Sequence, residues 1–150
     1  MTQVREARED ELGTVLKMYE WLFEPPGSRP GAWDEQRATE ALAEALRSES
    51  STVLVADHEQ RLIGLCTAYL DLHSVRFGPR CWVEDLAVDP ARRSAGVGSA
   101  LLEAARSWAR ERGATHLELD TAEARADAQR FYEREGADHR SISYTWPLDE

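Results

Sequence analysis

The sequence contains only two cysteines, Cys66 and Cys81, and no apolar stretch close to the roughly 20 residues that cross a bilayer. Two cysteines cannot form a disulfide framework. The first ten residues, MTQVREARED, lack the basic-then-apolar pattern of a signal peptide. These absences predict a cytoplasmic protein without a membrane partner.

Basic residues are also in the minority: 18 arginines and lysines stand against 28 aspartates and glutamates, which gives a net charge of −10. A protein of that sign repels a phosphate backbone, so we expect no nucleic-acid partner. The four histidines show no metal-ligand spacing such as His-x-x-x-His, and we expect no metal. The length and the 42% of hydrophobic residues suit a single globular domain over residues 1–150.

Hydrophobic periodicity predicts ten elements in the order β-α-α-β-β-β-α-β-α-β, an α/β fold with a mixed sheet and helices packed on it. The cluster of prolines and glycines at residues 25–31 separates the first two helices. The expected strands lie around Val4 and at residues 52–56, 62–72, 81–88, 115–121 and 141–146; the expected helices lie along residues 12–23, after a cap at Asp34, from Val97 to a stop at Gly113, and at about 124–135.

The segment VDPARRSAGVGS, from Val88 to Ser99, combines the end of a strand, a basic turn and glycines that open a helix. Backbone amides at a helix start attract anions, and glycine lets the backbone approach a phosphate closely. The pattern favours a diphosphate site; the alternative is a plain helix entry with solvated arginines. The absence of lysine from this segment argues against a phosphate-loop nucleotidase, and Leu101 stands where a Rossmann fingerprint needs its third glycine.

Within this segment, RSAGVG at residues 93–98 resembles the acetyl-CoA signature Arg/Gln-x-x-Gly-x-Gly/Ala of the GCN5-related N-acetyltransferase (GNAT) family. A second stretch, AQRFYEREG at residues 128–136, resembles the family's Ala-x-x-Phe-Tyr-Glu-x-x-Gly helix. The predicted element order agrees with the fold of that family. Three residues depart from its pattern: Ser94 stands for a common glycine, Arg125 for a frequent asparagine, and Ala137 for an aromatic residue.

The resemblance implies an N-acetyltransferase that moves an acetyl group from acetyl-CoA directly to a primary amine. Backbone groups at the end of the central strand would align the coenzyme and stabilise the charge that develops on the carbonyl oxygen, unless this is an ordinary paired strand end. The implied cofactor-binding residues are Leu86, Ala87, Val88, Arg93, Ser94, Ala95, Gly96, Val97, Gly98, Ser99 and Arg125.

Two side chains are expected to carry protons. Tyr132 matches the family's tyrosine that protonates the leaving thiolate; the alternative is a core aromatic, the role we expect for Phe131. Glu84 lies in the apolar segment WVEDLAV, where burial would suit a general base; the alternative is a salt bridge to an arginine. Strand alternation sends Glu84 and Asp85 to opposite faces, so we expect only one of them to reach the acceptor.

The acceptor is predicted from aromatic residues that flank the proline-glycine loop, among them Tyr19, since this segment walls the acceptor pocket in the family. Aromatic and acidic walls suit a small cationic amine or a peptide amine, although the same residues could pack in the core or in a dimer interface. The expected acceptor contacts are Trp21, Phe23, Trp33, Asp85 and Tyr144.

Two questions stay open at this point: the oligomeric state, and whether a different function fits the same sequence. The resemblance implies a homodimer, since family members often pair through their last strands. The competing interpretations are a non-catalytic acyl-CoA-binding or regulatory module on the same fold, and half of a dinucleotide-binding oxidoreductase. Leu101 and the length of the chain argue against the second of these.

Overall fold

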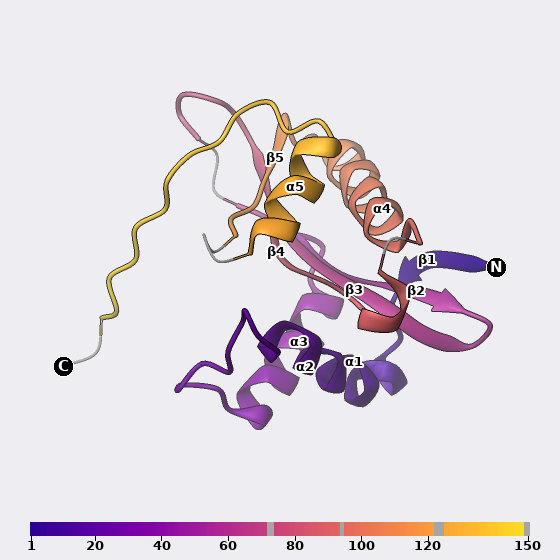
Figure 1. Ribbon diagram of the computed structural model, residues 1–150. Coiled ribbons are helices and arrows are strands. Elements are labelled where there is room, and N and C mark those ends of the chain that lie inside the picture. The colour runs from indigo at the N-terminus through magenta and orange to yellow at the C-terminus, as the bar shows by residue number, and fades with distance from the viewer. Residues whose placement is uncertain (72–73, 94, 122–124, 149–150) are drawn as a thin grey trace. The chain divides into compact units, whose positions relative to one another are not determined.

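A computed structural model describes residues 1–71, 74–93, 95–121 and 125–148 (Figure 1). It divides into two compact units, residues 1–119 and 120–150. Three positions of the predicted elements and motifs, Leu72, Ser94 and Ala124, lie outside the described residues. The predicted α/β class with a mixed sheet is confirmed.

The first unit is built on one five-stranded sheet in the order β1-β2-β3-β4-β5. The first four strands pair antiparallel, whereas β5 runs parallel to β4. The predicted strand at residues 115–121 is shorter than expected, because β5 pairs with β4 over three residues only. The strands are β1 (Thr2–Glu6), β2 (Ser51–His58), β3 (Arg61–Leu70), β4 (Arg80–Val88) and β5 (His116–Glu118).

Helices pack on both faces of this sheet (Figure 1). The predicted helix along residues 12–23 is divided at Tyr19 into α1 and α2. The predicted cap is confirmed, since the Asp34 carboxylate accepts the Arg37 amide at 3.0 Å. One face carries α1 (Leu12–Met18), α2 (Glu20–Phe23) and α3 (Glu35–Arg47); the other carries α4 (Val97–Glu111); 3₁₀ turns lie at Glu9–Glu11 and Pro90–Arg92.

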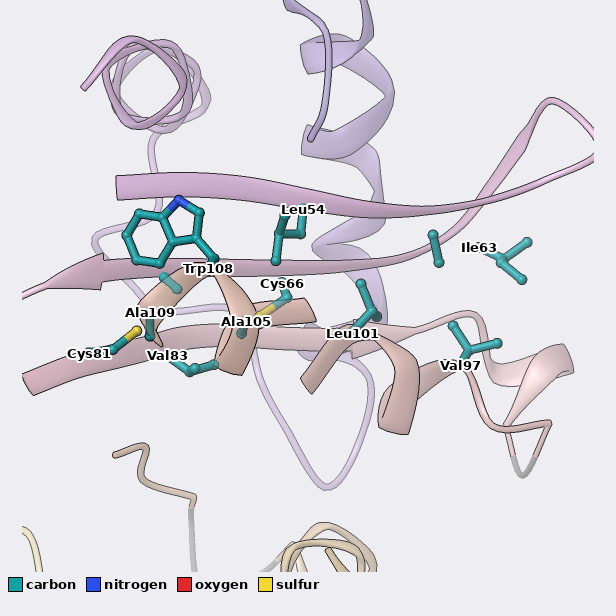
Figure 2. Close-up of a cluster of buried hydrophobic side chains, with 12 residues drawn as sticks. Leu54, Ile63, Cys66, Cys81, Val83, Val97, Leu101, Ala105, Trp108 and Ala109 are labelled. Atoms are coloured by element: carbon teal, nitrogen blue, oxygen red, sulfur yellow. The ribbon is translucent and has the colours of Figure 1, made fainter. Parts of the chain in front are cut away.

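Strand alternation divides the buried side chains of the sheet between two hydrophobic clusters. In β2, Val53 and Val55 pack against α1 and α3, while Leu54 and Ala56 pack toward α4. Figure 2 shows the second cluster, in which side chains of α4 lie over those of the strands. Its labelled members are Leu54, Ile63, Cys66, Cys81, Val83, Val97, Leu101, Ala105, Trp108 and Ala109.

The first turns of α4 lie directly on β3 because Gly64 has no side chain. A Cβ atom at Gly64 would lie 2.9 Å from Cδ1 of Leu101 and 3.0 Å from Cγ1 of Val97. Gly64 pairs with Val88, the last residue of β4. The absence of one methyl group therefore brings the N-terminus of α4 close to the end of β4.

The second unit contains one helix, α5 (Ala126–Arg134), among its described residues. The predicted strand at residues 141–146 is not formed. The alternation that suggested it is present, but Ile142, Tyr144 and Trp146 are each at least 75% exposed. Alternation defines a face, whereas a strand also needs a backbone partner, and the described residues provide none for this segment.

The close approach at Gly64 makes a prediction. Gly64→Ala should destabilise the protein by about 1–3 kcal/mol, the usual cost of overpacking a core, because the new methyl group displaces Leu101 and Val97. Chemical denaturation measures the loss. Gly13→Ala is the matched control: nothing lies within 4 Å of its added Cβ, and in α1 it should be neutral or stabilise by up to about 1 kcal/mol. Equal stabilities of the two variants would contradict this account of the helix–sheet contact.

Candidate active site

The connection from β4 to α4 has the strand–turn–helix geometry that the sequence predicts. After Val88, the Asp89 carboxylate accepts the Ala91 amide at 2.9 Å, which caps the short 3₁₀ turn. Arg61 donates to the other oxygen of Asp89 at 3.3 Å. Asp89 is buried, and these bonds fix the path of the chain toward α4.

Gly96 is the N-cap of α4 and has a φ of +84°, a conformation that favours glycine. The space beside it is open, since nothing lies within 4 Å of where a Cβ would stand. The amides of the first turn of a helix point out of its N-terminus, and a glycine cap has no side chain that could cover them. Arg93 is exposed on the same turn. This geometry fits a phosphate group.

The far edge of β4 is open beyond its first residues. β5 pairs only with the segment Arg80–Trp82, so the rest of this edge of β4 has no strand partner among the described residues. On the other edge, the Asp89 amide donates to the Ile63 carbonyl at 2.9 Å. Because hydrogen-bonding direction alternates along an antiparallel strand, the backbone groups of Leu86 and Val88 face the open edge.

A β-bulge in β4 corrects the expectation that Glu84 and Asp85 lie on opposite faces. The β3–β4 register shifts there: Thr67 pairs with Asp85, but Ala68 pairs with Val83, so β4 contains one extra residue. Val83 and Leu86 both pack toward α4, although they are three residues apart. The two carboxylates between them consequently line one cavity on the opposite face.

This cavity lies wholly within the first unit, between α3 and the strands β2, β3 and β4, and Tyr19 and Trp33 also line it; its volume is about 290 Å³. Its walls are aromatic and aliphatic, and its two acidic groups come from the bulge. The lining residues are Tyr19, Trp33, Ala38, Ala41, Leu42, Ala45, Ser51, Thr52, Thr67, Ala68, Tyr69, Glu84 and Asp85.

The Asp85 carboxylate is held by two hydroxyl groups. Tyr19 and Thr67 each donate to Oδ2 at 2.7 Å. Burial raises the pKa of Tyr19, and the charge of Asp85 raises it further, so the phenol stays protonated and remains a donor. Asp85 is therefore an oriented hydrogen-bond acceptor in the cavity wall.

Glu84 is exposed, which corrects the prediction of a buried carboxylate. The bulge explains the difference, because it turns Glu84 away from the α4 cluster toward the cavity. Its Oε1 accepts the Trp82 indole N–H at 3.2 Å and the Tyr69 hydroxyl at 3.4 Å. Partial burial and the neighbouring Glu84 raise the pKa of Tyr69.

The structure brings together only part of the predicted aromatic wall. Trp33 lines the cavity, with its ring 5.9 Å from that of Tyr19, and its indole Nε1 is buried without a partner among the described residues. Phe23 packs edge-on against Trp33 at 4.9 Å. Trp21 packs against the hydrophobic cluster beneath α1 and α3.

Thr67 and Tyr69 are site residues that the sequence interpretation missed. Both come from the apolar run of β3, where Thr67 is a polar side chain between Cys66 and Ala68. A buried polar residue needs a hydrogen-bond partner, and this was the available signal.

The remaining predicted residues belong to the second unit, described here by itself. Tyr132 is half-buried in α5. Phe131, expected in the core, is also only half-buried, with its ring 5.3 Å from that of Tyr132. Arg125 is the N-cap residue of α5, and Tyr144 is exposed.

The cysteines behave as small apolar residues, as predicted. Both are buried, and burial raises the pKa of Cys81 to about 11 and also raises that of Cys66. A thiol held in this way is a poor nucleophile. Over the described ranges, no three His, Cys, Asp or Glu side chains are grouped to hold a metal. No helix in that part of the chain is long and apolar enough to cross a membrane.

The sequence matches the acetyltransferase (GNAT) family over residues 15–137. Two relatives from Bacillus subtilis are named uncharacterized N-acetyltransferases. YhdJ is 35% identical over 59% of this chain and 63% of its own length, so the match spans less than two thirds of that protein. YhfO is 33% identical over 70% of each chain.

The fold agrees with that assignment. The aminoglycoside N-acetyltransferase AAC(6')-Iy, solved in complex with CoA, superimposes with a TM-score of 0.84 at 17% identity, over 98% of this chain and 94% of that one. The matched family, together with this fold, defines the class of protein as an acetyltransferase. The chain belongs to the GNAT acetyltransferase family.

The turn at Gly96 makes the second prediction. Gly96→Val should weaken acetyl-CoA binding by roughly tenfold or more, because a β-branched residue is strained at this φ and its side chain fills the open space. Isothermal titration calorimetry measures the affinity. Gly31→Val, which adds the same side chain in open space on an exposed loop, is the control. Unchanged affinity in a folded Gly96→Val protein would refute a phosphate site at this turn.

Proposed function

We propose that this protein transfers an acetyl group from acetyl-CoA to the primary amine of a small, cationic acceptor. The observation that carries the proposal is the bulge in β4, beside the open edge of the strand. It sets two carboxylates in an aromatic-walled cavity of about 290 Å³. Ring faces and negative charge both favour a cation.

The coenzyme would be held at the start of α4. The open space at Gly96 would leave room for its diphosphate, and the start of the helix and the exposed Arg93 would supply positive potential. The backbone groups of Leu86 and Val88 at the open edge of β4 would align its arm. An amide there also offers a fixed donor for charge that develops on the carbonyl oxygen.

Glu84 is the general base of this proposal. An aliphatic amine is an ammonium ion at neutral pH and has to lose a proton before it can attack a carbonyl carbon. Glu84 lines the cavity and is exposed, so it can accept that proton and pass it to water. Asp85, whose Oδ2 already accepts two hydroxyl groups, is less suited to proton transfer.

Tyr132 is the general acid of this proposal, on the strength of its position in the Phe-Tyr motif of α5. As the amine attacks, the bond from the carbonyl carbon to sulfur breaks and the thiolate leaves with the electron pair. Protonation of that thiolate by a tyrosine completes the release of CoA.

The two proton carriers give the third prediction. Glu84→Gln and Tyr132→Phe should each lower kcat by roughly 10²- to 10⁴-fold, the usual range for loss of a general base or acid, with little change in acetyl-CoA affinity. Thiol release from acetyl-CoA, followed with a panel of amines, measures the rate. Glu40→Gln, which removes the same charge from the exposed face of α3, is the control.

Two outcomes contradict parts of the proposal separately. If the wild-type protein binds acetyl-CoA and no amine accelerates thiol release, it is a binding module and not an enzyme. If amines are acetylated and Tyr132→Phe keeps the wild-type rate, the acid is a different group.

A further inference from the structure

The proton transfers proposed above give no role to Asp85, although the fold holds its carboxylate in a fixed orientation. Tyr19 and Thr67 both donate to its Oδ2, and no residue in the described part of the chain donates to Oδ1. Tyr19 and Asp85 are 66 residues apart in the sequence, so a long-range hydrogen bond orients this carboxylate. Asp85 also lines the cavity, where a ligand can reach it.

A charged carboxylate that pairs with an amine stabilises the ammonium form of that amine. An ammonium ion has no lone pair and cannot attack a thioester. Glu84 is exposed and can pass an accepted proton to water, whereas Asp85, whose Oδ2 already accepts two hydroxyl groups, is less suited to proton transfer. The group that binds Asp85 is therefore a poor candidate for the amine that is acetylated. It suits a second cation on the same acceptor, one that keeps its proton throughout the reaction.

The lining of the cavity other than the two carboxylates indicates what joins the two cations. It includes four aliphatic residues of α3 and three aromatic rings: Ala38, Ala41, Leu42, Ala45, Tyr19, Trp33 and Tyr69. Apolar walls favour a methylene chain over a linker rich in hydroxyl groups, which would lose hydrogen bonds to water there.

We propose that the acceptor is an aliphatic diamine, with its remote ammonium bound by Asp85 and its reacting amine beside Glu84. Asp85 is then the specificity-determining residue, and Tyr19 and Thr67 are positioning residues that act through it. This inference rests on the proposed acetyl transfer, and it divides the two carboxylates of the bulge between binding and proton transfer.

The test compares two amines of equal chain length, 1,4-diaminobutane and butylamine, which differ by one ammonium group. The wild-type protein should show a kcat/KM for the diamine roughly 10- to 100-fold higher, the value of one charged hydrogen bond. Asp85→Asn should bring this ratio toward one by raising the KM of the diamine. Glu84→Gln should lower kcat for both amines and keep the ratio.

The positioning residues provide a readout that a merely structural role would not change. Tyr19→Phe keeps the ring in the cavity wall and removes only the hydroxyl, and Thr67→Val does the same for the threonine. Both should lower the diamine-to-monoamine ratio through KM, by less than Asp85→Asn does. Thr67→Ser, which restores the donor, should restore the ratio. Glu40→Gln removes one charge from a residue of α3 that does not line the cavity, and it should keep the ratio.

The outcomes separate this inference from the function on which it rests. Equal kcat/KM for the two amines, or equal losses for both in Asp85→Asn, would overturn the inference and leave acetyl transfer intact. If neither amine is acetylated, calorimetric titration of 1,4-diaminobutane into the CoA-loaded protein decides. Binding at least tenfold weaker in Asp85→Asn supports the inference, and equal or absent binding overturns it.

Discussion

A single extra residue in β4 determines the chemistry of the first unit. Without the bulge, alternation would place either Glu84 or Asp85 among the apolar side chains under α4. One charge would then be buried without compensation. With it, Val83 and Leu86 both face α4 and both carboxylates face the cavity. The sheet thus keeps a continuous core on one side and presents two charges on the other.

The second constraint is how closely α4 approaches the sheet. Gly64 allows Val97 and Leu101 to sit on β3, which positions the glycine-capped end of the helix near the last residues of β4. Along β4, the carboxylates of the cavity come first, at Glu84 and Asp85, and the backbone groups of Leu86 and Val88 at the open edge follow them. The proposed diphosphate site, the open backbone groups and the acidic cavity therefore all involve β4 or α4, the helix that follows it.

The sequence was sufficient for features that depend on local pattern. Periodicity predicted four of the five strands with small errors, because apolar alternation and glycine or proline turns are local signals. It failed at residues 141–146, where alternation marks an exposed apolar face but cannot supply a strand partner. It also failed at Glu84 and Asp85, although the three-residue spacing from Val83 to Leu86, between two stretches of period two, is the mark of a bulge.

The cavity could not be predicted in the same way, because its parts meet only through pairing and packing. Thr67 and Asp85 become neighbours through the β3–β4 register, and Tyr19 reaches Asp85 from the junction of α1 and α2. The family motifs identified the strand end and the helix start but carried no information on these contacts. The acceptor side of such a protein varies with loops and packing, whereas the coenzyme side follows a short motif.

The most direct test of the central claim is a crystal structure of the protein with CoA and 1,4-diaminobutane. The account predicts the diphosphate at the first turn of α4 beside Gly96, and one nitrogen of the diamine within hydrogen-bond distance of Asp85 Oδ1. A diphosphate bound elsewhere, or a diamine that contacts neither carboxylate of the β4 bulge, would contradict it.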